Sequence, residues 1–445
     1  MTVSANERVI ADEQARHWRK RKLKFVSDVL TSNVDKHIVE GEAAVRLCNY
    51  TDVYYHEKIT PDMPFMQGSA TESEIERFGL KKGQVLLTKD SESWEDIAVP
   101  AYVSETMPEV VCGYHLAVIE PDSGEVDGRF LSWLAQSPVL NDQFKLSAKG
   151  VTRFGLSQHA LKNAVIDAPP LEYQLKVAAF LDRKTAEIDT LIAKKRRLLD
   201  RLAEKRTALI TRAVTKGLNP DAPMKDSGIE WLGEIPVHWR VGHLRRALLK
   251  VEQGWSPACE DRPVIEGEWG VLKSGCVNGG EYDESNHKAL PAGLEPRPSL
   301  LVQPSDVLMC RASGSTHLIG SVAIVRETTR QLMFSDKTYR LSVDEGVISS
   351  SFLVHSMDSK YMREQILLSI SGAEGLANNI PQSAMKDYQI CIPPLDEQKA
   401  IDRRIEEEKA RGVEIADRIE RAIERLKEYR SALITNAVTG QIKVA

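Results

Sequence analysis

Two stretches of the chain carry apolar residues at seven-residue spacing over long runs without proline. The first begins at Leu171 and reaches about Val214, and the second follows Pro394. The spacing predicts a coiled-coil seam in each stretch. The predicted seam residues are Leu181, Ile188, Leu202 and Leu209, with Leu191 and Leu198 on a neighbouring line, and then Ile405, Ile419, Leu426 and Leu433, with Ile415 on a neighbouring line. Each stretch is therefore expected to form one long helix.

These two stretches are copies of one unit. The phrase PPLEYQ begins at Pro169, and PPLDEQ begins at Pro393. The first run closes with TALITRAVTKGL and the second with SALITNAVTGQI, and both pairs of phrases align at one constant offset. A matched start and a matched end at fixed spacing indicate an internal duplication.

A β-rich stretch with many turns precedes each helix. VLLTKDS from Val85 and VLMCRASGS from Val307 are counterparts in these stretches, and HWRKRKL at His17 matches HWRVGHL at His238. The predicted fold class is α+β, with two β-rich domains in tandem, each followed by a long helix. The predicted boundaries are 1–168 for the first domain with its N-terminal segment, 169–218 for the first helix, 219–392 for the linker and second domain, and 393–445 for the second helix.

A long amphipathic helix cannot bury its apolar stripe alone, so the two helices are expected to pair with each other. Antiparallel pairing is favoured, because a parallel pair would require the linker to span the whole helix length. Antiparallel helices would relate the two domains by a pseudo-twofold axis. Duplex DNA has matching symmetry, and twofold proteins read half-sites spaced by their own geometry. Because the domains differ in sequence, we expect a bipartite and asymmetric target.

Composition sets limits on the class of protein. The formal net charge is -5, so bulk charge gives no evidence for a nucleic-acid partner. None of the 6 cysteines stands in a C-x-x-C pair, so no zinc site is expected. The N-terminal segment is polar and charged, without the apolar core of a signal peptide, and no apolar run approaches the roughly 20 residues that a membrane helix needs. We expect a reduced, cytoplasmic setting.

Catalytic motifs are missing from the sequence. It contains no phosphate-binding G-x-x-x-x-G-K-[ST] loop and no dinucleotide-binding G-x-G-x-x-G turn. Ala168 and Ile392 precede the Pro-Pro pairs, and neither side chain can hydrogen-bond a base amine, as an adenine methyltransferase motif requires. Asp90 and His115 could form a catalytic pair, but a lone histidine near a β-run is more often structural. We expect no independent enzymatic activity and no cofactor bound by this chain.

In combination, PPLEYQ, PPLDEQ, the two helix endings and SGIEWLGEIPVHW resemble the specificity subunits of Type I restriction-modification systems. The resemblance covers nearly the whole chain. It implies two target-recognition domains, each followed by a conserved helix that spaces them, in a subunit without catalysis of its own. It also implies double-stranded DNA and two methylation subunits as partners, and restriction subunits in some assemblies. S-adenosylmethionine, ATP and Mg are then expected only in those partners. The first domain keeps only His17 and Trp18 of the SGIEWLGEIP lead-in.

Candidate DNA contacts lie in four polar loops, at 88–95, 148–158, 311–317 and 374–382. Lysine and arginine bind phosphates, and small polar and amide side chains read base edges. The predicted phosphate contacts are Lys89, Arg153, Lys273 and Arg311. The predicted base contacts are Ser91, Thr152, Gln158, Ser313, Ser315, Asn378, Asn379 and Gln382. For each single residue, an exposed loop position without a role is an equally good interpretation, so the loops are the firmer prediction.

A second class of function also fits the pattern. Two globules on a coiled coil could form a scaffold that joins protein partners without binding DNA. The strong divergence of the two globules, beside the similarity of their helix ends, favours separate readers of two targets.

Overall fold

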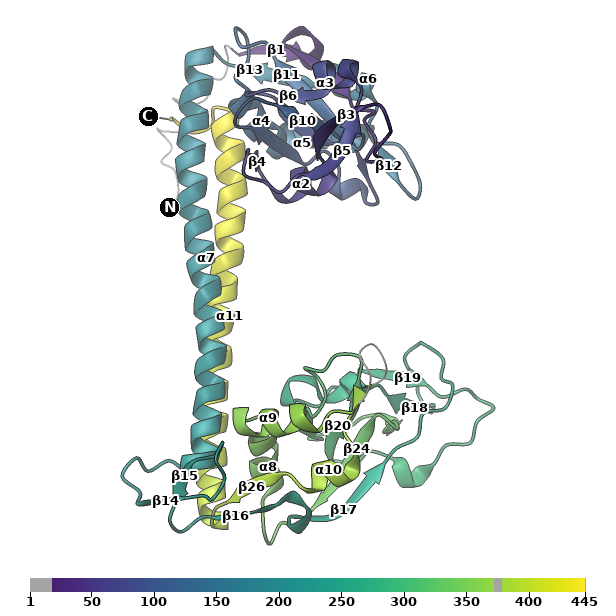
Figure 1. The fold of residues 1–445 in the computed structure, drawn as a ribbon, viewed down its shortest axis with the longest axis vertical. Coiled ribbons are helices and arrows are strands. Elements are labelled where there is room, and N and C mark those ends of the chain that lie inside the picture. Colours follow the sequence, from purple (N-terminus) through teal and green to yellow (C-terminus); the bar gives the residue numbers. More distant parts are fainter. Residues whose placement is uncertain (1–17, 372–377, 445) are drawn as a thin grey trace. The chain divides into compact units, whose positions relative to one another are not determined.

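The computed structural model describes residues 18–371 and 378–444, and it divides into two compact units. The division passes through both long helices, between Lys195 and Arg196 and between Ile419 and Glu420. The first unit holds the first β-rich domain, the start of helix α7 (Leu171–Lys216) and the end of helix α11 (Leu395–Val438). The second unit holds the second domain and the remaining halves of both helices (Figure 1). The predicted α+β class is confirmed.

Two sheets form the first domain. The larger has the order β2-β11-β7-β9-β4, and the smaller has the order β5-β3-β10-β6, in which β10 pairs parallel with β3. Their strands are β2 Ser27–Thr31, β3 Ala43–Cys48, β4 Lys58–Ile59, β5 Met66–Ala70, β6 Gly79–Leu80, β7 Val85–Thr88, β9 Pro100–Val103, β10 Met107–Cys112 and β11 Leu116–Pro121. Apolar side chains from both sheets, such as Leu47, Leu86 and Val111, form one buried core.

Short helices and two-stranded ladders complete this domain. The helices are α2 Tyr50–Tyr55, α3 Glu72–Phe78, α4 Gly128–Gln136, α5 Pro138–Ser147 and α6 Gln158–Asn163, with 3-10 turns at Leu23–Phe25 and Trp94–Asp96. The ladders pair β1 Arg19–Lys22 with β13 Val165–Ala168, and β8 Asp90–Ser91 with β12 Phe154–Gly155. The first ladder brings the chain back to the start of α7.

The second domain repeats this plan. Its sheets have the orders β17-β24-β20-β22 and β19-β18-β23, and β18 again pairs parallel with β23. Their strands are β17 Leu248–Gln253, β18 Trp269–Leu272, β19 His287–Ala289, β20 Val307–Cys310, β22 Val322–Ile324, β23 Gln331–Met333 and β24 Thr338–Val343. The helices are α8 Ser350–Met357, α9 Lys360–Ser369 and α10 Gln382–Lys386, with 3-10 turns at Leu244–Arg246, Ser274–Gly280 and Pro298–Leu300. The ladders pair β16 Arg240–His243 with β26 Gln389–Ile392, and β21 Ala312–Ser313 with β25 Asn378–Asn379.

The linker between the copies is ordered by contact. Its strands β14 (Met224–Asp226) and β15 (Glu234–Pro236) form an antiparallel hairpin. At its turn, the Trp231 ring stacks on Tyr361 with centroids 5.9 Å apart. The second domain thus begins with a short hairpin fastened to its own helices.

The glutamine of each PPLxxQ phrase explains why the phrase occurs twice. Gln174 accepts a hydrogen bond from the Asp127 N–H at 2.9 Å and donates to the carbonyls of Glu125 and Pro169. Gln398 accepts from the Ser349 N–H at 2.7 Å and donates to the carbonyls of Val347 and Pro393. Both side chains are fully buried. Each glutamine therefore fastens the start of a long helix to the turn that precedes α4 or α8.

Within each unit the two long helices run antiparallel. In the first unit, Arg430 of α11 donates to Asp189 of α7 at 3.0 Å. In the second unit, Ile210 of α7 shares a buried cluster with Ile401 near the start of α11. Gly217 ends α7 with a φ of 72°, and a Cβ there would lie 2.9 Å from a carboxylate oxygen of Glu397. A glycine is required at this stop for both reasons.

The predicted neighbouring line of the seam is wrong in both helices. Leu191, Leu198 and Ile415 are 47%, 50% and 45% exposed, whereas Ile192 and Ile423 are buried. The buried line lies one residue later, because positions three and four residues beyond a seam residue flank it equally and the partner helix covers only one of them. The other predicted seam residues are buried or half-buried: Leu181, Ile188, Leu202, Leu209, Ile405, Ile419, Leu426 and Leu433.

Candidate nucleic-acid interface

Two of the predicted loops in each domain meet in a short ladder, which we call the clasp. The first clasp is β8 with β12, and the second is β21 with β25. The backbone hydrogen bonds around the two clasps match, and we call this shared arrangement the backbone frame. Lys89 donates its N–H to His115 O at 3.0 Å, and Arg311 donates its N–H to Lys337 O at 2.9 Å. The next turn of each clasp also matches, since Ser93 N–H donates to Ser91 and Ser315 N–H donates to Ser313, both at 3.2 Å.

Charged side chains gather on the first clasp. Lys89 Nζ lies 2.8 Å from Asp90 Oδ2, and His115 Nδ1 lies 3.0 Å from the same oxygen. Arg153 Nη2 lies 3.1 Å from each ring nitrogen of His115. Partial burial raises the pKa of Asp90, but the hydrogen bonds from Lys89 and His115 outweigh it and hold the pKa below its usual range. Because Lys89 and His115 already bind the Asp90 carboxylate, the exposed Arg153 guanidinium is available to an anion such as a phosphate.

The second clasp uses its arginine differently. Arg311 donates to Asp336 O at 3.2 Å and to Asn379 Oδ1 at 3.3 Å, and its guanidinium carbon lies 5.3 Å from the Tyr339 ring centroid. These contacts hold Arg311 across the clasp. Lys337, which takes the place of His115, is exposed. The second clasp therefore presents an ammonium group where the first presents a guanidinium and an imidazole.

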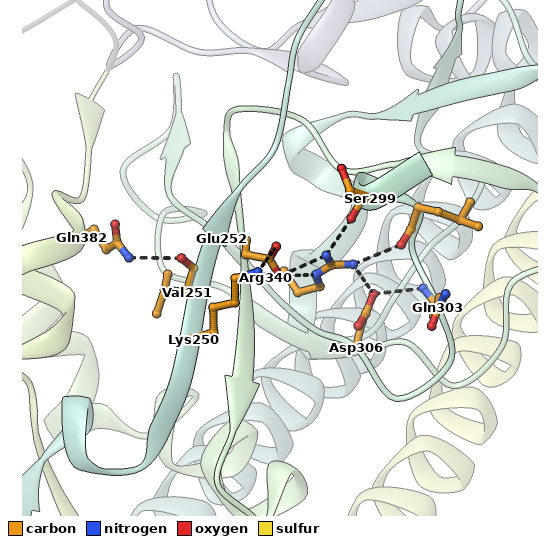
Figure 2. Close-up of polar contacts among 9 residues, drawn as sticks. Lys250, Val251, Glu252, Ser299, Gln303, Asp306, Arg340 and Gln382 are labelled. Atoms are coloured by element: carbon orange, nitrogen blue, oxygen red, sulfur yellow. Dashed lines mark hydrogen bonds and ion pairs between the residues drawn. The ribbon is translucent and has the colours of Figure 1, made fainter. Parts of the chain in front are cut away.

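Gln158 and Gln382, predicted to read bases, have equivalent places inside the two domains. Gln158 Nε2 donates to Val29 O at 2.6 Å, and Gln382 Nε2 donates to Val251 O at 3.3 Å (Figure 2). Val29 and Val251 lie on the edge strands β2 and β17. Both amides fasten the helix after the clasp to a sheet edge, so their donor groups are engaged within the fold.

The remaining predicted contacts divide between the clasps and one separate position. Thr152 is exposed beside Arg153, and Asn378 and Asn379 form β25. Lys273 lies outside the second clasp, at the start of a 3-10 turn, with Nζ 3.4 Å from Asp261 Oδ1. Part of the predicted loop 374–382, residues 374–377, lies outside the described residues.

Sequence reasoning missed an aromatic group next to the first clasp. Tyr50 and Tyr54 of α2 stack with centroids 5.3 Å apart, and Tyr55 meets Tyr54 edge-on at 5.0 Å. Tyr54 donates to Asp96, at the end of the turn that leaves β8. The available signal was the run YTDVYY, whose aromatic density is unusual for a loop. The counterpart in the second domain, Ser274–Gly280, has no aromatic residue.

Comparison with known proteins adds independent evidence. The sequence model of the family described as the Type I restriction modification DNA specificity domain matches residues 45–200. The Type I restriction enzyme EcoEI specificity subunit of Escherichia coli is 31% identical over 198 residues, which cover 44% of this chain and 33% of that relative. The alignment thus spans one third of the relative's length. A putative type I restriction enzyme MjaX specificity subunit of Methanocaldococcus jannaschii is 24% identical over 444 residues, covering 96% of this chain and 94% of the relative.

Solved structures agree on the fold. A chain from a study of complex assembly and conformational transition of the type I R-M system superimposes with a TM-score of 0.69 at 15% identity, covering 95% of this chain and 97% of the other. The HsdS subunit from Thermoanaerobacter tengcongensis superimposes with a TM-score of 0.52 at 15% identity, covering 96% and 97%. The chain is thus similar to Type I restriction enzyme specificity subunits, and its residues 45–200 match the DNA specificity domain of that family. The matched residues include the first clasp and the first part of α7.

The described part of the chain holds no helix that is both long and apolar enough to cross a membrane.

Proposed function

We propose that the chain is a non-catalytic DNA-recognition subunit that reads an asymmetric bipartite target. Each domain reads one half-site through its clasp, and the paired helices set the spacing between the two readings. The whole subunit then acts within a Type I restriction-modification complex. The cofactors expected for that complex, S-adenosylmethionine, ATP and Mg, belong to partner subunits in this proposal.

One observation carries the proposal: the two clasps share a backbone frame but differ in side chains. His115 in the first frame corresponds to Lys337 in the second, and Asp90 corresponds to Ala312. A frame kept constant while its chemistry changes is expected of two readers with different half-sites. The exposed cations Arg153 and Lys337 supply phosphate attraction, which gives affinity without sequence information, whereas Lys89 is paired with Asp90.

Exposed apolar residues on the long helices support partner docking. In the first unit these are Leu175 and Leu191 of α7 and Tyr429 of α11, and in the second unit they are Leu198 of α7 with Leu395, Val413 and Ile415 of α11. Exposed apolar groups on a polar helix face mark protein contacts when several lie together. We propose that each unit docks one methylation subunit by its helices, and that restriction subunits bind the resulting complex in systems that encode them.

The test is selection of DNA by the assembled complex. The chain and its methylation subunit are mixed with a random duplex library, and the retained fragments are sequenced. Two short conserved blocks separated by an unread spacer are expected. Retention without any sequence preference would support the competing function, a coiled-coil scaffold for protein partners. Inserting about four residues in register into α7 should then change the spacer length accepted and leave both blocks unaltered.

A further inference from the structure

The most exposed large apolar side chains of the described residues lie beside the two clasps. Val151, Leu368 and Leu146 are 93%, 88% and 84% exposed, and no other large apolar side chain in that part of the chain exceeds them. Leu146 lies near the end of α5, and Leu368 lies near the end of α9. Val151 follows in the segment that leads from α5 to β12. Single exposed apolar residues are ordinary when they are scattered over a surface, but these three all lie at or after the end of the short helix that leads to a clasp.

Leu146 and Leu368 occupy equivalent positions in the two domains. Each stands just before the residue that bridges to its clasp, Lys149 to Gly155 in the first domain and Ser371 to Asn379 in the second. Less than one helical turn separates the leucine from that bridge in both domains. The duplication has therefore placed the same exposed residue at the base of each clasp.

Other residues kept identical between α5 and α9 are explained by the fold. Gln143 donates to Val165 O and accepts from Val165 N–H, both at 2.8 Å. Gln365 makes the same pair of bonds with Gln389, at 3.0 and 2.8 Å. Each glutamine anchors its helix to the strand that precedes a long helix. The leucines have no such contact, so the fold does not account for their identity.

The surroundings of Leu146 favour DNA over a protein partner, and Leu368 takes the equivalent place in the second domain. Leu146 stands among Lys145, the exposed Ser147 and the exposed Lys149, with Arg153 farther along the same segment. An exposed apolar side chain among cations suits a nucleic-acid groove, where it can contact a thymine methyl group or enter between base pairs. A protein interface would offer a cluster of apolar neighbours at its centre.

We propose that Leu146 and Leu368 are matched apolar contacts to duplex DNA, one for each half-site. This inference rests on the proposed function, because it requires that the clasps face DNA. The leucine would add specificity to the phosphate contacts of the clasp. The two domains would then make the same apolar contact with their half-sites and differ in their polar contacts.

The experiment uses the complex of the chain with its methylation subunit and the selected target duplex. Leu146→Ala and Leu368→Ala are each expected to weaken target binding about tenfold, the size of a good base contact. Ile38→Ala and Leu249→Ala remove apolar residues that are 74% and 73% exposed but lie in other segments, and they should bind as the wild type does. Leu146→Met and Leu368→Met should restore most of the affinity.

Altered targets assign each leucine to a half-site. When one half-site is scrambled, the loss caused by the leucine that reads it should disappear, while the loss caused by the other should persist. Replacing thymine by deoxyuridine in that half-site should erase the loss if the contact is a thymine methyl group. A 2-aminopurine probe should brighten with the wild type and not with the alanine variant if the side chain separates base pairs.

Two outcomes would overturn the proposal. Wild-type affinity for both alanine variants would show that the leucines make no contact with DNA. Normal affinity of the assembled complex, combined with weaker binding of the methylation subunit in the absence of DNA, would assign them to a protein interface. The proposed function is judged separately, by whether the wild-type complex selects a target at all.

Discussion

The two recognition domains build the same sheet with opposite kinds of side chain at one pair of positions. In the first domain, Leu30 of β2 pairs with Val118 of β11. In the second domain, Glu252 of β17 pairs with Arg340 of β24 in the same register. Arg340 donates to Glu252 at 3.0 Å and to the carbonyls of Ser299 and Leu301 at 2.9 and 3.1 Å (Figure 2).

This difference indicates which contacts both domains need for their common fold. The cross-strand pair can be apolar or ionic, so its chemistry is not what specifies the sheet. The glutamine anchors are the same in both copies: Gln143 and Gln365, Gln158 and Gln382, Gln174 and Gln398. Gln174 and Gln398 are fully buried, and the other four are half-buried. These amides hold the fold of each domain by satisfying backbone groups, because an unpaired buried backbone group is costly. The other side chains are then free to diverge.

The largest effect is expected from the anchors at the start of the long helices. Gln398→Ala leaves Ser349 N–H and two carbonyls unpaired in a buried place, which should cost about 4 kcal/mol of the free energy of unfolding. Gln174→Ala should cost the same in the first unit, because its three contacts are the same. Hydrogen exchange of the amides in each unit measures the two losses separately.

The exposed Gln331 provides the control, since Gln331→Ala should change the free energy of unfolding by less than about 0.5 kcal/mol. A loss of about 4 kcal/mol in one unit and almost none in the other would mean that the two anchors are not equivalent.

The ionic pair of the second domain gives the next largest effect. Arg340→Ala leaves the half-buried Glu252 with Lys250 as its remaining ion-pair partner, and it frees the carbonyls of Ser299 and Leu301, so it should destabilise the second unit by about 2–3 kcal/mol. The double variant E252L/R340V transplants the pair of the first domain and should recover most of that loss, because an apolar pair can replace a buried ion pair. Urea denaturation followed by hydrogen exchange in β17 and β24 measures both.

If the double variant were as unstable as Arg340→Ala, the contacts of Arg340 with Ser299 and Leu301 would matter more than the ion pair. The ionic pair of the second domain could then not be exchanged for the apolar pair of the first, because Arg340 would be needed to hold the loop that carries the carbonyls of Ser299 and Leu301.

A third contrast lies where the long helices meet α4 and α8. In the second unit, Asp402 is largely buried beside His355, Glu406 and Glu345, and burial raises its pKa to about 6. Four residues after the anchoring glutamine of α7, the corresponding residue is Ala178. Between pH 4 and pH 7 the folded second unit therefore binds a proton on Asp402 that the unfolded chain releases, so the contribution of Asp402 to stability falls as pH rises through this window. His355, whose pKa burial lowers to about 4, contributes in the opposite sense.

Asp402→Asn should remove that dependence and raise the free energy of unfolding by about 2 kcal/mol at pH 8, with little change at pH 4. Lys409 and the Ser349 hydroxyl favour the ionised form and limit the gain. Hydrogen exchange of the second unit at both pH values measures it, and the first unit is the internal control. An equal gain at pH 4 would show that the carboxylate charge is not the cause.

The fold was largely predictable, and the exceptions have a physical cause. The repeats and the heptad spacing predicted the two domains and the helices, because these patterns are local. The second buried line of the seam was not predicted because it includes a polar residue. Thr185 is buried on that line, and its hydroxyl donates to Leu181 O at 2.7 Å, which makes a polar residue acceptable there. Leu191 and Ile415 look better suited, but the helix partner does not cover them.

The candidate site was predictable as loops and less so as residues. Gln158 and Gln382 stand in polar loops and resemble base contacts, yet each donates to a strand that is distant in the sequence. A single sequence does not reveal such a partner. The exposed leucines beside the clasps were missed for the opposite reason, since an apolar residue at the end of an amphipathic helix is expected to be buried.

The smallest effect on stability separates the two arginines of the clasps. Arg153 is exposed, so Arg153→Ala should change the free energy of unfolding by less than about 0.5 kcal/mol. Arg311 donates hydrogen bonds to Asp336 and Asn379, so Arg311→Ala should lower the free energy of unfolding by about 1–2 kcal/mol.

For DNA affinity, Arg153→Ala should have the larger effect of the two substitutions. Arg153→Ala should lower the affinity of the assembled complex and reduce the salt dependence by about one phosphate contact, whereas Lys337→Ala, not Arg311→Ala, should do so in the second half-site. If Arg311→Ala reduced the salt dependence at unchanged stability, Arg311 would contact phosphate despite its bonds within the clasp, and the two domains would use their arginines alike.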